Sequence, residues 1–147
     1  MTHVRTQLRN AVAAALSGVL ASVPDARLVK GRNFAVNIDR GAWLRVHARS
    51  STAERADPDK SERTFAVEVV HDCPGPAVEE TLDEAAAAIE QALEADGPLQ
   101  GLCFDWWLAS DEITLNPEAA DGSGQLVMVF SAEIWVARGD PETITFA

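Results

Sequence analysis

No apolar run in this sequence approaches the roughly 20 residues that a membrane-spanning helix needs. The longest candidate, residues 11–23, is interrupted by Ser17, Gly18 and Ser22. Two arginines precede this stretch, as they do in many signal peptides, but the stretch itself is rich in alanine and amphipathic. It therefore predicts a folded helix rather than a signal peptide, and we expect a cytosolic protein without a membrane partner.

Cysteine and histidine are scarce as well, and their spacing does not match a metal site. Cys73 and Cys103 lie 30 positions apart, and neither belongs to a C-x-x-C pair. His3, His47 and His71 show no H-x-x-H or H-x-x-x-H spacing. Structural zinc sites use such clusters, so we expect no metal and no cofactor. In a reducing cytosol the two cysteines are interpreted as small buried side chains rather than as a disulfide.

Basic residues are nearly absent from the second half of the chain. The net charge is −11, and Arg138 is the only basic residue after Arg63. The chain up to Arg63 carries eleven basic and six acidic residues, a charge of +5, whereas the remainder carries seventeen acidic residues and a charge of −16. The acidic total argues against a nucleic-acid reader and against binding to anionic membranes. Either the two halves neutralise each other within one fold, or a basic face of one subunit meets an acidic face of the next.

The sequence also lacks a pattern typical of catalysis. The run His-Asp-Cys at residues 71–73 alternates across a strand and ends at a proline, without the glycines of an oxyanion hole. Gly-Ser-Gly at residues 122–124 precedes a strand and lacks the lysine of a phosphate loop. Asp105, Asp111 and Glu112 are spaced as carboxylates commonly are on a solvated strand. We therefore expect that the protein is not an enzyme.

Apolar residues at helical spacing predict two helices, over residues 4–21 and 78–95. Thr2 is the expected N-cap of the first helix, and Gly97-Pro98 closes the second. Alternating apolar and polar residues predict strands at residues 43–49, 64–71, 102–115 and 125–137, with short extended pieces at 26–30 and 33–39. The strand over residues 125–137 is apolar on both faces, which predicts that it lies at the centre of the sheet.

Two segments between these elements contain no helical or strand pattern. Ser50–Glu62 has no large apolar residue and is interpreted as a mobile polar loop, and residues 116–124 as a hairpin connection. The chain of 147 residues is long enough for one domain with one core. The order of elements predicts an α+β fold, a single mostly antiparallel sheet with two helices packed on one face, over residues 1–147.

The adjacent tryptophans Trp106 and Trp107 must point to opposite faces of their strand. If Phe104 and Trp106 face the core, Trp107 lies on the far face, where Trp43, Trp135 or another subunit covers it. Because tryptophan is enriched in the buried centre of protein interfaces, Trp107 is a candidate interface residue.

The layout of these elements resembles the phage tail terminator family, of the minor tail protein U type, and more broadly the tail-completion proteins. The resemblance is one of arrangement along most of the chain rather than of a sharp motif. It comprises Thr6–Leu16, the strand Trp43–Arg49, the polar segment Ser50–Glu62, the strand Arg63–Val70, the acidic helix around Leu82-Asp83-Glu84, the turn Leu99–Leu102 and the strand Gln125–Val136.

The resemblance implies a structural virion protein of the tail or neck, assembled in the host cytoplasm and active without cofactor or catalytic residue. It implies a hexameric ring that caps the tail tube, ends its polymerisation and joins the tail to the head, with the tail tube protein and the head–tail connector as partners. We expect Arg49, Arg55, Lys60 and Arg63 to contact acidic residues of a neighbouring subunit, with Trp107 as an anchor. Two alternatives are another neck or head–tail connector protein, and a small acidic monomer that masks a basic partner.

Overall fold

A computed structural model describes residues 3–17, 27–30, 43–74, 78–95, 99, 101–116 and 123–145. Along the chain its elements are α1 (Val4–Leu16), β1 (Arg27–Lys30), β2 (Trp43–Asp57), β3 (Lys60–Pro74), α2 (Val78–Ala95), β4 (Asp105–Asn116), β5 (Ser123–Ala137) and β6 (Asp140–Ile144).

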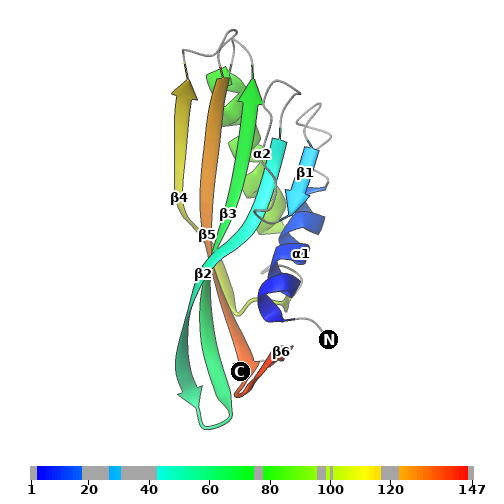
Figure 1. Ribbon diagram of the computed structural model, residues 1–147, viewed down its shortest axis with the longest axis vertical. Coiled ribbons are helices and arrows are strands. Elements are labelled where there is room, and N and C mark those ends of the chain that lie inside the picture. Colours follow the sequence, from blue (N-terminus) through cyan, green and yellow to red (C-terminus); the bar gives the residue numbers. More distant parts are fainter. Residues whose placement is uncertain are drawn as a thin grey trace.

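The strands form one six-stranded sheet in the order β1-β2-β3-β5-β4, and β6 pairs with β5 outside this path. All neighbouring strands are antiparallel except β1 and β2. The sheet is long and strongly twisted, and both helices lie on one of its faces (Figure 1). The predicted α+β fold, a mostly antiparallel sheet with two helices on one face, is therefore confirmed. We call the face away from the helices the open face.

The core lies between the helices and the covered face of the sheet. Both helices bury one stripe of apolar residues at helical spacing, which for α1 are Val4, Leu8, Val12 and Leu16 and for α2 are Leu82, Ala85, Ile89 and Leu93. The strands bury alternate residues against these stripes, namely Phe65, Val67 and Val69 of β3 and Leu126, Met128, Phe130, Ala132, Ile134 and Val136 of β5. The periods of about 3.6 and 2 residues that predicted these elements are thus the periods of burial.

The helices begin where the sequence predicts. α2 spans the predicted residues 78–95, and α1 begins at the predicted residue and ends at Leu16. The N-cap of α1 is His3 instead of the predicted Thr2, because His3 Nδ1 accepts a hydrogen bond of 3.0 Å from the backbone N–H of Arg5. Thr2, residues 18–21 and the predicted extended piece 33–39 lie outside the described residues.

The prediction of a mobile loop at Ser50–Glu62 is wrong. β2 continues to Asp57, β3 begins at Lys60, and the two strands pair along this whole stretch up to Asp57 opposite Lys60. Backbone groups pair regardless of the side chains, so a ribbon that buries little needs no apolar alternation. We call residues 50–64 the arm; Figure 1 shows its tip extending past the helix layer.

Two further differences concern β4 and the chain end. Phe104, predicted to face the core, is 56% exposed because it precedes β4 at a bend, and its ring stacks on Trp135 with centroids 5.3 Å apart. Trp106 is buried and Trp107 is 39% exposed on the open face, as predicted. β6 was not predicted; Gly139, with φ 78°, makes the tight turn that returns the chain along β5.

Candidate functional site

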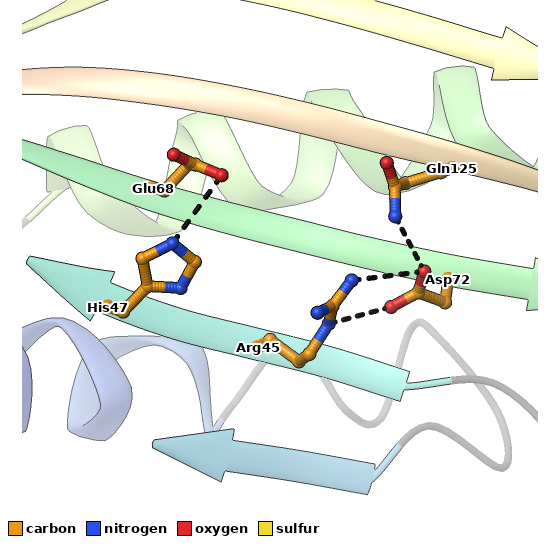
Figure 2. Close-up of polar contacts among 5 residues, drawn as sticks. All are labelled: Arg45, His47, Glu68, Asp72 and Gln125. Carbon is orange, nitrogen blue, oxygen red and sulfur yellow. Dashed lines mark hydrogen bonds and ion pairs between the residues drawn. The ribbon is translucent and has the colours of Figure 1, made fainter. Parts of the chain in front are cut away.

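A seam of polar side chains crosses the open face at the helix-covered end of the sheet (Figure 2). Arg45 of β2 donates to the Asp72 carboxylate of β3, from Nε to Oδ2 at 2.9 Å and from Nη2 to Oδ1 at 3.3 Å. Gln125 of β5 donates from Nε2 to Asp72 Oδ1 at 2.9 Å. Asp72 is buried, and it therefore links three strands while its charge is compensated by the Arg45 guanidinium.

The second half of the polar seam joins β2 to β3. His47 Nε2 lies 3.5 Å from Glu68 Oε1, and the His47 side chain is buried although it points to the open face. Together with Arg45, Gln125 and two valines, this pair lines a shallow hollow of about 270 Å³. A His–carboxylate pair can move a proton, but the described residues that line the hollow include no serine, cysteine or lysine that could serve as a nucleophile.

Sequence reasoning weighed His47 only as a metal ligand and did not single out this seam. The signal was the alternation in β2, which places Arg45 and His47 on one face, and in β3, which places Glu68 and Asp72 on one face. The third partner, Gln125, could not have been found because its register against β3 depends on the pairing of two strands more than 50 residues apart.

The structure separates the members of the predicted His71–Cys73 run. His71 and Cys73 point into the core, whereas Asp72 joins the polar seam on the opposite face. Both cysteines are buried in the core and neither forms a disulfide bond, which confirms their interpretation as small core residues. Burial raises the pKa of the Cys73 thiol, and burial together with the nearby Asp105 charge raises the pKa of Cys103 to about 12.

The other candidate ligands are not brought together. His3 caps α1, His47 lies on the open face and His71 lies in the core. Asp105 is opposite Glu133 whereas Asp111 is opposite Met128, so the β4 carboxylates are spread along the strand. In the part of the chain that the structure describes, no group of three His, Cys, Asp or Glu side chains is arranged to hold a metal ion.

The four predicted basic interface residues all lie on the arm or at its base. Arg55 is exposed near the tip, and Lys60 begins β3 with its ammonium 5.5 Å from the centre of the Trp135 ring. Arg63 is half-buried on β3, and Arg49 occupies the bulge between Ala48 and Ser50 in β2.

The tip of the arm forms a second hollow, of about 150 Å³. Arg55 and Lys60 line it together with Arg138, which follows β5, and with one acidic residue, Glu54. Arg138 is tied to the arm, because its backbone N–H donates to Asp59 O at 2.8 Å and its guanidinium donates to Pro58 O at 3.4 Å. The structure thus brings three cations together at the tip, and sequence reasoning missed Arg138 because it lies far along the chain.

The predicted interface residue Trp107 is not part of this tip. It lies on β4, opposite Ser131 of β5, on a strand that does not touch β2 or the outer side of the arm. The predicted set is therefore split into a basic tip and an exposed tryptophan on the opposite edge of the sheet.

Carboxylates crowd the open face beside the arm. Glu133 of β5 lies opposite Asp105 of β4, and Glu62 is one row away, opposite Trp135. Burial, then the negative charges of Glu62 and Asp105, raise the pKa of Glu133 above its ordinary value. These residues are far apart in sequence, so only the strand register reveals that they are neighbours.

Searches of protein-family models and of curated proteins found no match to this chain. Among the described helices, none has the length and apolar character needed to cross a bilayer.

Proposed function

We propose that the protein is a structural subunit of virion assembly that caps the phage tail tube, ends its polymerisation and joins the tail to the head as a hexameric ring. The arm is the single observation that carries the proposal. It is a ribbon that continues the sheet past the helix layer, with exposed side chains on β2 from Thr52 to Arg55 (Figure 1). In the arm, residues 60–64 of β3 also pair with β5, up to Lys60 opposite Ala137. β2 is therefore the outer strand of the arm, and such an extension is suited to contact with a neighbouring subunit.

The distribution of charge on the folded molecule supports a head-to-tail ring. The tip of the arm gathers Arg55, Lys60 and Arg138 around one hollow. The outer face of α2 carries only acidic charges, on the exposed residues Glu79, Glu80, Asp83, Glu84, Glu90 and Glu94. A closed ring of identical subunits with heterologous contacts needs two unlike surfaces on each subunit, and unlike charge favours such a pairing.

The molar mass in solution tests the ring. Light scattering across protein and salt concentration should give a mass near six times the 15.8 kDa chain mass. Electron microscopy of that species should then show a central hole. In the producing phage, loss of the protein should give overlong tails, whereas normal tails unattached to heads would assign it to the neck or head–tail connector instead.

Reversing the charge of the arm tip should weaken the ring. The double change Arg55→Glu and Lys60→Glu replaces two cations of the tip hollow, and like charges at an interface should raise the dissociation constant about tenfold or more. The matched control exchanges the cations, Arg55→Lys with Lys60→Arg, and keeps both charges. If both variants retain the mass and the thermal midpoint of the original chain, the arm tip is not a subunit interface.

A second candidate is a small acidic monomer that masks a basic partner. The acidic outer face of α2 favours it, because such a surface also matches a basic protein. A monomer at every concentration, together with a one-to-one complex with a basic protein, would support this candidate over the ring.

A further inference from the structure

The outer edge of β4 is unpaired within the described part of the chain. β4 pairs with β5 along its whole length, from Asp105 opposite Glu133 to Asn116 opposite Ser123, and it ends the order β1-β2-β3-β5-β4. The outer side of this 12-residue strand therefore presents backbone N–H and C=O groups that no described strand satisfies. A long unpaired edge is a template for pairing with another chain.

Exposed apolar side chains gather on the same strand. Among the described residues, the large hydrophobic side chains that are strongly exposed are Phe104 at 56%, Leu115 at 46% and Trp107 at 39%. Trp107 and Leu115 belong to β4, and Phe104 directly precedes it. Trp107 lies opposite Ser131 on the open face, whereas Leu115, beyond the bulge in β4, lies opposite Gly124 on the covered face. Exposed apolar residues near both ends of an unpaired edge strand favour that edge as an interaction site.

A second free edge lies on the other side of the sheet. Among the described residues β1 pairs with residues 43–46 of β2, and no described strand pairs with residues 48–57 of β2 from outside. This free edge is similar in length to β4, which has 12 residues. β2 and β4 run in opposite directions, because each neighbouring pair from β2 through β3 and β5 to β4 is antiparallel (Figure 1). Two copies placed side by side in the same orientation therefore present antiparallel edges to each other.

We propose that β4 of one copy pairs with residues 48–57 of β2 in the next copy, so that the sheet continues from subunit to subunit. The inference rests on the proposed ring and names the backbone contact that closes it. The occupant of the β4 edge is accordingly a second copy of this chain, bound head to tail.

The charges on the two edges favour this pairing over pairing of β4 with itself. β4 carries Asp105, Asp111 and Glu112 and no basic residue. A β4–β4 pair would therefore place carboxylates beside carboxylates, and like charges on neighbouring strands are destabilising. Residues 48–57 of β2 contain two arginines, Arg49 and Arg55, and two acidic residues, Glu54 and Asp57, so they carry no net charge that would repel β4.

The two edges are staggered along the strand direction. Through β5, the β4 edge lies level with residues 64–74 of β3, whereas residues 48–57 of β2 lie level with residues 60–67. A sheet that closes on itself needs tilted strands and a fixed stagger between its two ends. The stagger therefore suits closure of a ring better than an untilted stack of subunits.

Paired proline substitutions test the edge contact. Asp111 and Glu112 are exposed neighbours on β4, and in an antiparallel strand one of two adjacent N–H groups points toward β5 and the other points outward. Asp111→Pro and Glu112→Pro each remove one donor. The variant that keeps the thermal midpoint of the original chain has lost the outward N–H, and we expect its ring dissociation constant to rise about tenfold or more. Asp111→Ala and Glu112→Ala keep the N–H groups and should keep the mass.

Amide hydrogen exchange provides a second readout that needs no variant. Outward amides of β4 and of residues 48–57 should exchange at least about tenfold more slowly in the ring than in the dilute monomer, while the exposed turn of the arm should not change. A ring whose two edges remain unprotected overturns the edge pairing and leaves the proposed ring in place. A chain that is monomeric at every concentration overturns the edge pairing as well, and the tail-length phenotype then decides the proposed function separately.

Discussion

At the helix-covered end of the sheet, β3 and β5 bury Val67, Val69 and Phe130 beneath α1 and α2, whereas in the arm β2 and β3 carry polar residues that are exposed or half-buried. The same strands thus form for two reasons. Burial of apolar surface stabilises the first region directly. The arm extends a register that the covered end has already set, so its backbone pairing depends on the stability of its neighbour.

The most direct test of this comparison is a pair of truncations, one in each region of the sheet. Phe130 is fully buried and its ring stacks on Trp106 with centroids 4.9 Å apart, so Phe130→Ala should lower the free energy of unfolding by about 3–5 kcal/mol. Thr52→Ala, at an exposed position of the arm, should change it by no more than about 0.5 kcal/mol. Urea unfolding of the monomer followed by circular dichroism measures both values.

A large decrease in the free energy of unfolding for Thr52→Ala would contradict this explanation of the arm. A loss comparable to that of Phe130→Ala would mean that the arm belongs to the same cooperative core. Thr52→Val, which keeps the branched shape and favours strands, serves as the matched control and should leave the stability unchanged or slightly higher.

The same contrast explains which elements could be predicted from the sequence. The bounds of α2 follow from its apolar stripe with acidic residues at its start and a Gly-Pro pair after it, and α1 and β5 follow from their own burial periods. The arm was missed because Ser50–Glu62 has no burial period of its own. What makes it a ribbon is pairing with a distant strand, and that information is not local in the sequence.

The candidate site residues also fall into two groups, those that local alternation predicts and those that depend on pairing between distant strands. The exposure of Trp107 follows from alternation within one strand, and the error at Phe104 arose because a bend before β4 interrupts that alternation. The polar seam, the carboxylates around Glu133 and the place of Arg138 in the arm tip all depend on registers between distant strands. Periodicity predicts the face of a strand on which a residue lies but not its neighbours across the sheet.

A substitution on the open face of the helix-covered end should have an effect on stability of intermediate size. Asp72→Ala removes the acceptor of both Arg45 and Gln125 and leaves the half-buried guanidinium without its ion pair, so the free energy of unfolding should fall by about 1–3 kcal/mol. Chemical denaturation at neutral pH measures the loss. The matched control is Asp111→Ala, an exposed aspartate on β4, which should change stability little.

A double-mutant cycle with Arg45→Ala sharpens that prediction. If Arg45→Ala costs no further stability once Asp72 is alanine, the loss belongs to the pair. Independent, additive losses would show instead that each side chain contributes through its own packing, and the polar seam would not act as a unit.

The smallest effect is expected beside the arm, where the carboxylates of Glu62, Asp105 and Glu133 crowd one another. Burial and the two neighbouring charges raise the pKa of Glu133 in the folded protein above its ordinary value of 4.5, so the folded state holds this proton more tightly than the unfolded chain. The free energy of unfolding must then decrease as pH rises from 4.5 through the folded pKa.

Glu133→Gln cannot ionise and should therefore be more stable than the original chain at neutral pH, with the difference vanishing below pH 4.5. Water screens a partly exposed carboxylate, so the gain should be smaller than the Asp72→Ala loss. Urea unfolding at the two pH values measures it, and Glu90→Gln on the exposed face of α2 is the control expected to show no such gain. A gain that persists at acidic pH would arise from packing instead of charge. A gain confined to neutral pH would mean that the ionised Glu133 carboxylate destabilises the sheet here, through its partial burial and through repulsion by Glu62 and Asp105, a cost that the apolar covered end does not carry.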